Sequence, residues 1–178
     1  MDSINQNQKE ENFKNLIGQE ALDKIRTLAK KAGSCFMCTK LVAGGPFATR
    51  PMAAEEIDDE GNFWFLSAVD SDKNEQISAD PGVQLLFQGS AYTDFLSLYG
   101  YATISTDKGK IEKLWDPTMK TWFTEGVDDP RITVIKFRPT EGYYWDTKHG
   151  MAVAMVKRAI GAIKGETIDD SIEGNIIP

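Results

Sequence analysis

The sequence contains little histidine and cysteine, the side chains on which many metal and nucleophilic sites depend. Its 178 residues include one histidine, His149, and two cysteines, Cys35 and Cys38. One histidine excludes a multi-histidine metal centre, and neither an H-E-x-x-H pair nor a G-x-S-x-G elbow occurs. We therefore predict no metal site and no serine triad, and we expect His149 to be an exposed loop residue.

Glycine-rich nucleotide loops and long apolar runs are also missing. Neither G-x-G-x-x-G nor a Walker loop is present. The longest apolar run, Met151 to Val156, is far shorter than the ~20 residues of a membrane-spanning helix. The polar start, Met1 to Gln8, lacks the layout of a signal peptide. We expect a cytoplasmic protein with no membrane partner.

The two cysteines form a C-x-x-C motif inside a segment that has the pattern of a strand. Residues three apart in a strand point to opposite faces, which disfavours a disulfide or a shared metal. A thioredoxin-like site would place them at a helix start instead. We predict that Cys35 and Cys38 are buried free thiols, as expected in a reducing compartment.

Negative charge is in excess. There are 20 Lys and Arg against 27 Asp and Glu, a net charge of −7, and the pI is about 4.8. Nucleic acids and anionic membranes need a positive surface, so both are excluded as general partners. A small basic pocket for a single phosphate is not excluded. With 41% hydrophobic residues, the length is enough for one domain with its own core.

Hydrophobic periodicity and turn residues predict the order of elements. We expect a helix from Leu16 to Ala32 that stops at Gly33, and a capping box at Asp72 and Glu75. Strands are predicted over 35–43, 47–57, 63–69, 83–88, 94–105 and 132–137, with 143–145 either continuing the last or starting another, and helices over 70–80, 107–114, 118–123 and 151–163. About six strands with short helices predict a barrel or closed sheet rather than a doubly wound fold. One domain would span 16–165, between a flexible lead-in (1–15) and a tail (166–178).

The first candidate motif is Thr49-Arg50-Pro51-Met52, in the second predicted strand. Because proline cannot donate to a sheet ladder, Pro51 implies an edge, a bulge or a bend. Arg50 beside such a break could reach a ligand. The alternative is an edge strand with a solvated arginine.

The second candidate motif is Ser67 to Lys73, which runs from a strand into a helix start. Backbone N–H groups and the positive end of the helix dipole would stabilise a phosphate there. Ser71 adds a hydroxyl and Lys73 a full charge. The alternative is that Ser71 and Asp72 are simple helix caps.

The third candidate motif holds two tryptophans, Trp115 and Trp122. Aromatic faces can cover a planar cofactor, but tryptophan also fills cores and subunit interfaces. The motif alone does not choose between these roles.

Taken in order, these stretches resemble the pyridoxamine 5′-phosphate oxidase-like FMN-binding split-barrel proteins, in particular the general stress protein 26 group. The resemblance covers about Glu20 to Gly165. It rests on these motifs together with Asp128-Asp129-Pro130 and Glu141-Gly142-Tyr143-Tyr144-Trp145-Asp146. It implies a mainly β fold with peripheral helices, a six-stranded antiparallel split β-barrel. It also implies a homodimer with FMN, or FAD in its place, in clefts between the subunits.

By position, the resemblance places Arg50 and the Ser71-Asp72-Lys73 stretch at the flavin phosphate. Thr49, Arg50, Pro51 and Met52, with Leu66 and Ser67, would flank the ribityl chain and the ring edge. Trp115 or Trp122 would approach from the partner subunit.

Three departures separate the sequence from the authentic oxidase. Asp72 stands where the oxidase has an Arg, Glu55 stands where it has a substrate-phosphate Lys, and its C-terminal Arg-Leu-His motif has no counterpart. An anion in place of a cation opposes a phosphate, which argues against pyridoxamine phosphate oxidation. The sequence thus predicts an FMN-dependent oxidoreductase for another small molecule, with no catalytic side chain nominated. The alternatives are a non-catalytic flavin carrier or sensor, or a haem-binding or deazaflavin-using relative.

Overall fold

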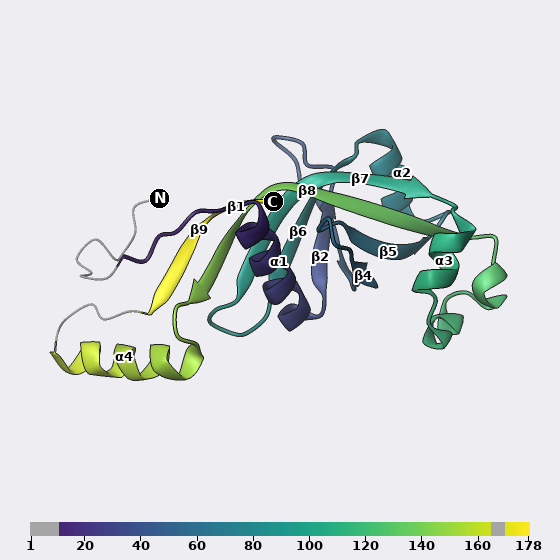
Figure 1. Ribbon diagram of the computed structural model, residues 1–178. Coiled ribbons are helices and arrows are strands. Elements are labelled where there is room, and N and C mark those ends of the chain that lie inside the picture. Colours follow the sequence, from purple (N-terminus) through teal and green to yellow (C-terminus); the bar gives the residue numbers. More distant parts are fainter. Residues whose placement is uncertain (1–10, 165–169) are drawn as a thin grey trace.

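The computed structural model describes residues 11–164 and 170–178, which form one mixed β-sheet with helices around it (Figure 1). The strands are β1 (Leu16–Ile17), β2 (Cys35–Thr39), β3 (Ala48–Met52), β4 (Glu56–Ile57), β5 (Phe63–Ala68), β6 (Gly82–Gln88), β7 (Phe95–Ser105), β8 (Ile132–Thr147) and β9 (Ser171–Ile177). The helices are α1 (Gln19–Ala32), α2 (Asp72–Ala79), α3 (Lys108–Leu114) and α4 (Met151–Lys164), with 3-10 turns η1 (Pro117–Thr121) and η2 (Gly126–Asp128).

The sheet is curled, and the connection from β3 to β4 links its β3 edge to the β4–β5 pair. Its order is β1-β9-β8-β7-β6-β2-β3, and β5 pairs with β8 while β4 pairs with β5. The chain passes from β3 to β4, and within the described residues no ladder joins β3 to β4 or β5. The predicted class, mainly β with peripheral helices, is confirmed. The predicted six antiparallel strands are wrong, because the sheet has nine strands and β1 pairs with β9 in parallel.

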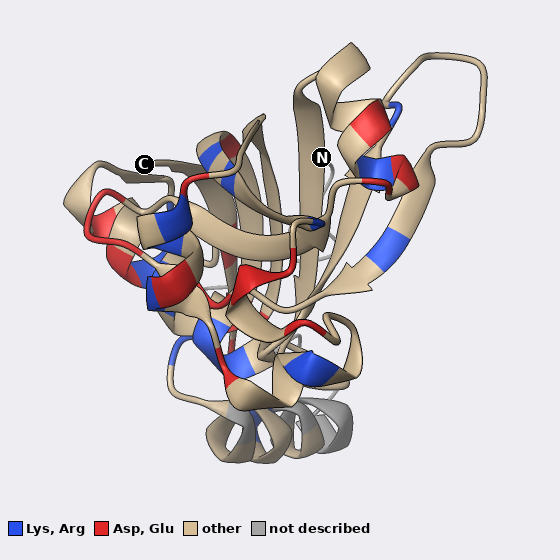
Figure 2. Cartoon of the chain, turned by 90° about the vertical axis from the view of Figure 1, so that its right-hand side faces the viewer, with Lys and Arg blue, Asp and Glu red and all other residues tan. Residues whose placement is uncertain are grey.

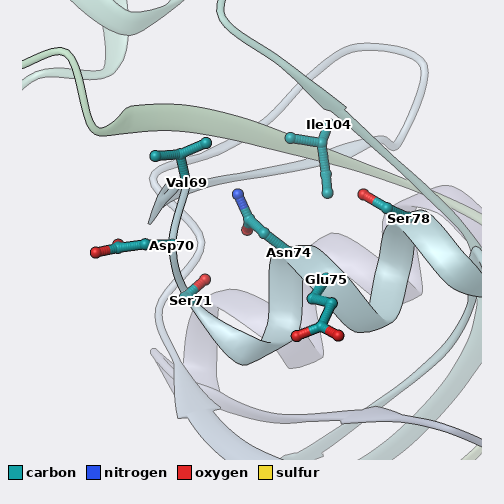
Figure 3. A pocket seen from close by; sticks show the side chains of 7 residues that line it. All are labelled: Val69, Asp70, Ser71, Asn74, Glu75, Ser78 and Ile104. Atoms are coloured by element: carbon teal, nitrogen blue, oxygen red, sulfur yellow. The ribbon is translucent and has the colours of Figure 1, made fainter.

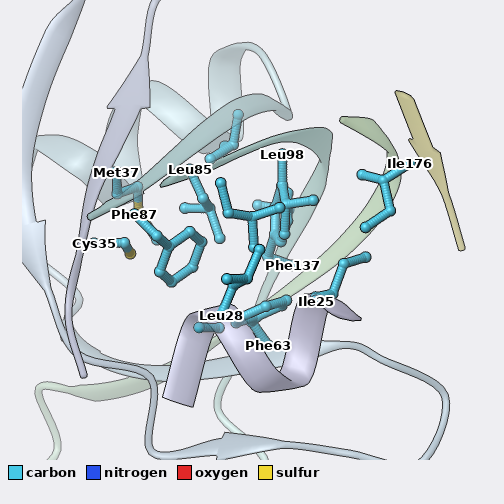
Figure 4. Close-up of a cluster of buried hydrophobic side chains, with 14 of the residues drawn as sticks. Ile25, Leu28, Cys35, Met37, Phe63, Leu85, Phe87, Leu98, Phe137 and Ile176 are labelled. Carbon is cyan, nitrogen blue, oxygen red and sulfur yellow. The ribbon is translucent and has the colours of Figure 1, made fainter. Parts of the chain in front are cut away.

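Alternating side chains of the curled strands fill one core. Phe63 of β5 points inward and meets Phe137 of β8, and Ile25 and Leu28 of α1 cover the cluster (Figure 4). Phe65 of β5 is buried in the same cluster. The phenyl rings of Phe63 and Phe137 lie 6.1 Å apart in an edge-on arrangement, which is favoured for aromatic pairs. A smaller cluster packs α3 and η1 onto β8, through Ile111, Leu114, Met119, Phe123, Ile132 and Val134.

Several predicted elements change at their ends. The first helix begins at Gln19 because Leu16 pairs in β1, and it stops at Gly33 in a left-handed conformation, as predicted. The strand predicted over 47–57 breaks into β3 and β4. The capping box is wrong, since Ser71 is the N-cap of α2 and makes no side-chain capping bond. The two stretches around Phe137 and Trp145 form one continuous strand, β8.

The C-terminal segment is not a simple tail. Residues 171–177 form β9, which pairs with β8 on one side and β1 on the other. The alternation of apolar and polar residues in β9 is short and largely polar, so the sequence pattern only weakly predicts this strand. The end predicted for the last helix, Gly165, lies outside the described residues, as do residues 1–10 of the lead-in.

Asp170 ties the start of β9 to α4. It is fully buried; its Oδ1 lies 2.7 Å from His149 Nδ1 and accepts a hydrogen bond from Lys157 Nζ at 2.9 Å. His149 is an exposed loop residue, as predicted, but the sequence does not reveal this partner. Burial acts to raise the pKa of Asp170, and the hydrogen bonds from His149 and Lys157 outweigh it and lower the pKa to about 2.

Cys35 and Cys38 are buried free thiols, as predicted. Burial, and secondly the neighbouring Cys38, raises the pKa of the Cys35 thiol to about 12, which makes it unreactive. In the described ranges, no helix is long and apolar enough to cross a membrane. Nor do three or more His, Cys, Asp or Glu side chains gather there as a metal site.

From the packing of the core we predict how much Phe137 contributes to the free energy of unfolding. Phe137→Ala should lower the free energy of unfolding by about 3–5 kcal/mol, because it removes a fully buried ring and leaves a cavity. Tyr92→Ala is the control, since Tyr92 is 75% exposed and its loss should change stability by less than about 0.5 kcal/mol. Urea unfolding of the three proteins measures both values. Equal stability of the two variants would contradict this description of the core.

The Asp170 contacts predict a pH dependence. The pKa of Asp170 is lower in the folded chain than its ordinary value of 3.8, so its contribution to stability is complete above about pH 4. It is lost as the pH falls from 3.8 toward about 2, because in this range the unfolded chain binds a proton at Asp170 and the folded chain does not. Asp170→Asn should therefore show a weaker acid-induced loss of stability than the wild type in urea titrations. Asp128→Asn, at an exposed position, is the control, and parallel curves for wild type and Asp170→Asn would refute the contact's role.

Candidate functional site

Arg50 lies on an edge strand and is held in place from two sides. In the described chain β3 pairs only with β2, so the missing N–H of Pro51 costs no ladder bond, and the predicted edge is confirmed. The Arg50 guanidinium is not freely solvated. It donates to Thr39 Oγ1 and to Gln76 Oε1, each at 2.8 Å. These bonds direct Arg50 from β3 toward α2.

Lys73 lies in the first turn of α2, near Arg50. It is partly buried, and burial together with the positive charge of Arg50 lowers the pKa of its ammonium group. The carboxylates of Asp70 and Asp72 offset part of this effect. Asp72 itself is exposed at the first helical position, where its carboxylate faces solvent. Two cations from separate elements are thus brought close together.

A buried polar network fixes the start of α2 against the sheet. Asn74 Nδ2 donates to Thr133 Oγ1 of β8, and Ser67 Oγ of β5 donates to Asn74 Oδ1, both at 2.8 Å. Thr133 Oγ1 donates to the Ser67 carbonyl at 3.0 Å, and the hydroxyls of Ser67 and Ser71 lie 3.1 Å apart. Because these buried groups satisfy one another, the helix start is held in one position.

This arrangement has the chemistry of a phosphate site. A helix N-terminus presents unpaired N–H groups and a positive dipole end to an anion. Arg50 supplies a planar fork of donors and Lys73 a point charge, and a dianion between them would relieve their repulsion. Burial, and secondly the charge of Arg50, lowers the pKa of Lys73, so a bound anion would favour the charged form of this side chain.

A cavity of about 320 Å³ lies beside the same helix (Figure 3). Its lining includes the carboxylates of Asp70 and Glu75, the hydroxyls of Ser71 and Ser78, and Ile104 of β7. No cation belongs to this lining, so it does not suit a phosphate. Along the chain drawn in Figure 2, positive residues are interspersed with negative ones. Arg50 and Lys73 lie near enough to each other for the charge of Arg50 to lower the pKa of Lys73.

The other predicted residues on the strands lie around this place. Thr49 is exposed on β3, and its hydroxyl lies 3.6 Å from Cys38 Sγ. Met52 is partly buried and packs against the main core. Leu66 precedes Ser67 on β5 and packs against the smaller cluster. The structure thus brings Arg50 near Lys73, and separately brings the Ser67 and Ser71 hydroxyls together.

The two tryptophans have different surroundings. Trp115 is partly buried and packs on Phe123 of its own chain, with 6.4 Å between the ring centroids. Trp122 is 68% exposed. Their predicted role toward a partner subunit stays a prediction, and Trp122 is the one whose ring is open to a second chain. The Asp128 to Pro130 motif has a structural use, since Asp129 binds Arg131 through both carboxylate oxygens at the start of β8.

Four residues of the site are not evident from the sequence. Thr39 and Gln76 hold Arg50, and Asn74 and Thr133 hold α2. Gln76 follows Lys73 by three residues on the helix, so helical spacing could have identified it. Thr133 and Thr39 have no sequence pattern that distinguishes them from other strand residues. Only the strand register shows that they lie beside Ser67 and near Arg50.

Glu55 follows β3, and its carboxylate is close enough to that of Asp116, at the start of η1, to be affected by its charge. Burial, and then the negative charge of Asp116, raises the pKa of Glu55. This part of the surface therefore repels an anionic substrate group.

Comparison with known proteins agrees with this geometry. Residues 20–169 match the family model described as Pyridoxamine 5′-phosphate oxidase like. A curated relative, protein bli-3 of Neurospora crassa, is 26% identical over 139 residues. The match covers 73% of this chain and 66% of bli-3, so the chain spans just under two thirds of that relative's length.

Solved structures share the fold. A Jannaschia sp. CCS1 protein assigned as general stress protein 26 superposes with a TM-score of 0.72 at 23% identity, covering 88% of this chain and 97% of that one. The general stress FMN/FAD binding protein from Xanthomonas citri gives 0.58 at 22% identity, covering 70% and 87%. Since the family model matches most of its length, the chain belongs to the pyridoxamine 5′-phosphate oxidase-like family and resembles its general stress protein 26 members.

Proposed function

We propose that this protein binds flavin mononucleotide and serves as a flavin-dependent oxidoreductase for a small molecule. The observation that carries the proposal is the approach of Arg50 and Lys73 at the start of α2, which leaves a positive charge for a phosphate to balance. The family match and the FMN/FAD binding neighbour from Xanthomonas citri support the choice of a flavin.

The residues present fit the phosphate of such a cofactor. Arg50 is already oriented by Thr39 and Gln76, so little side-chain entropy is lost on binding. Ser71 and the first N–H groups of α2 supply further donors. When bound, the flavin would supply the redox chemistry, and the chain would anchor it, orient it and limit its exposure to water.

The proposed substrate is not a phosphate ester such as pyridoxamine 5′-phosphate. Asp116 is close enough to Glu55 to raise its pKa, after burial, so an anionic substrate group there would meet two carboxylates. A neutral or cationic acceptor suits this charge. We include in the proposal a homodimer with the flavin between subunits, since the Trp122 ring is 68% exposed and thus open to a second chain.

Flavin binding is tested by fluorescence titration. FMN should bind to the purified protein, and riboflavin, which lacks the phosphate, should bind more weakly. Arg50→Gln should weaken FMN about 10- to 100-fold, the range for a lost charged hydrogen bond, and leave riboflavin affinity unchanged. Arg138→Gln is the control because Arg138 is exposed on β8. Absence of any flavin uptake would refute the proposal.

Turnover is tested on the flavin-loaded protein. Rapid reduction of the bound flavin by NADH or NADPH, followed by reoxidation with a small-molecule acceptor, is the expected result. Reduction by dithionite alone would instead assign the protein as a flavin carrier.

Replacing Lys73 should have opposite effects on the stability of the flavin-free protein and on FMN binding. Lys73→Gln should raise the free energy of unfolding of the flavin-free protein by about 0.5 kcal/mol, the scale of a partly exposed charge interaction, because it removes a partly buried charge and, secondly, its repulsion from Arg50. The same change should weaken FMN binding. Lys108→Gln, at an exposed position of α3, should alter neither property. A loss of stability in flavin-free Lys73→Gln would mean that the Lys73 charge is already balanced.

A further inference from the structure

A cavity of about 250 Å³ lies between the last turn of α1 and the segment that leads from β3 into β4. Neither Arg50 nor Lys73 of the phosphate site belongs to its lining. An apolar cavity of about 150 Å³ can hold a benzene molecule, so this one has room for a small ring or branched chain with polar groups beside it. The lining residues are Ala29, Lys30, Gly33, Ser34, Ala54, Glu55, Glu56, Ile57, Phe63 and Phe87.

Two packed phenyl rings give this lining its aromatic surface. The ring centroids of Phe63 and Phe87 lie 5.6 Å apart, and the rings are tilted by 40°. Both belong to the main core that α1 covers (Figure 4). Ile57 of β4 and Ala54 add aliphatic surface. Because the two rings are held by the core, they offer a preformed apolar surface to a ligand.

Lys30 and Glu55 place opposite charges on the same lining. In the part of the chain that the structure describes, neither forms an ion pair, with each other or with a third residue. Lys30 lies in the last turn of α1. The Glu55 N–H donates to the Trp64 carbonyl at 2.8 Å, which fixes the Glu55 backbone beside β5. The cavity therefore has one unpaired cation and one unpaired anion at fixed places in the chain.

The neighbouring charges leave this pair uncompensated. Glu56 is bound by Lys110 Nζ at 2.6 Å and Lys113 Nζ at 2.8 Å, so its own charge is balanced. Burial, and secondly the negative charge of Asp116, raises the pKa of Glu55. A positive group of a ligand beside Glu55 would favour its charged form.

We propose that this cavity binds a small zwitterion with an apolar side chain, the chemistry of an α-amino acid such as leucine or phenylalanine. The ligand's ammonium group pairs with Glu55, its carboxylate pairs with Lys30, and its side chain packs on the two phenyl rings. A cation alone would also meet Lys30, and an anion alone would also meet Glu55, so each would bring a repulsive contact with the attractive one. A zwitterion satisfies both charges.

The site is a binding site in its own right and does not require a bound flavin. Ala54 and Glu55 follow β3, the strand that carries Arg50, so the ligand lies along the same part of the chain as the proposed phosphate site. That this ligand is the substrate of the oxidoreductase rests on the proposed function. Its net charge of zero agrees with the repulsion of anionic groups at Glu55.

Calorimetric titration of the flavin-free protein tests the ligand class. L-leucine or L-phenylalanine should bind. For leucine, the matched amine is isopentylamine and the matched acid is 4-methylpentanoate, and each should bind at least 10-fold more weakly, the scale of one lost charged hydrogen bond. Glycine, which lacks the side chain, should also bind at least 10-fold more weakly. Absence of binding by both amino acids, or equal binding of the amine or the acid, would overturn the inference.

Charge-removing variants test the assigned partners. Glu55→Gln and Lys30→Gln should each weaken amino-acid binding about 10- to 100-fold. Glu55→Gln should also tighten binding of 4-methylpentanoate, and Lys30→Gln that of isopentylamine, because each removes a repulsion. Lys108→Gln and Glu112→Gln, at exposed positions of α3, are the controls and should bind like the wild type.

Circular dichroism and thermal unfolding show whether each variant folds, and the comparison of ligands on the wild type needs no variant. Folded Glu55→Gln and Lys30→Gln proteins that bind amino acids like the wild type would overturn the assignment. FMN titration of the same samples keeps the two proposals apart. FMN binding without amino-acid binding refutes this site and leaves flavin binding standing, and amino-acid binding without flavin uptake does the reverse.

Discussion

The rest of the structure depends on β8, which belongs to three ladders. Its first half, Ile132 to Phe137, pairs with β5, its second half, Gly142 to Thr147, pairs with β9, and β7 pairs along both. The first half joins β5 to β7 across the phenylalanine core. It also supplies Thr133, which accepts a hydrogen bond from Asn74 of α2. The second half leads into α4. The register of this one strand therefore sets the positions of α2, which carries the proposed phosphate site, and of α4.

Local charge, and not net charge, gives the site its character. The chain as a whole is acidic, yet β3 and α2 bring Arg50 and Lys73 together against their mutual repulsion. The buried hydrogen bond from Asn74 to Thr133 and the partly buried one from Arg50 to Gln76 hold this arrangement in place. Interactions that stabilise the fold thus maintain a charge arrangement that is relieved when an anion binds.

Sequence patterns predicted the features of the site that depend on neighbouring residues in the chain. Pro51 indicated a strand edge because proline lacks a donor, and Ser71 to Lys73 indicated a helix start because capping and dipole effects act within one turn. The capping box was wrong by one residue, since the position of the N-cap depends on how the Asn74 network docks the helix. β9 was missed because its pairing with β8 and β1 compensates for a weak strand pattern.

The sequence by itself determined the mainly β class, the absence of a multi-histidine metal centre, the edge character of β3 and the choice of Arg50 and Lys73 as candidate phosphate ligands. Each of these follows from composition or from interactions between residues close in the chain. Only the tertiary structure decided that Thr39 and Gln76 direct Arg50, that Thr133 anchors α2, and that Asp170 ties α4 to the start of β9. These contacts join residues far apart in the chain, and strand register, which sets them, is a property of the whole sheet.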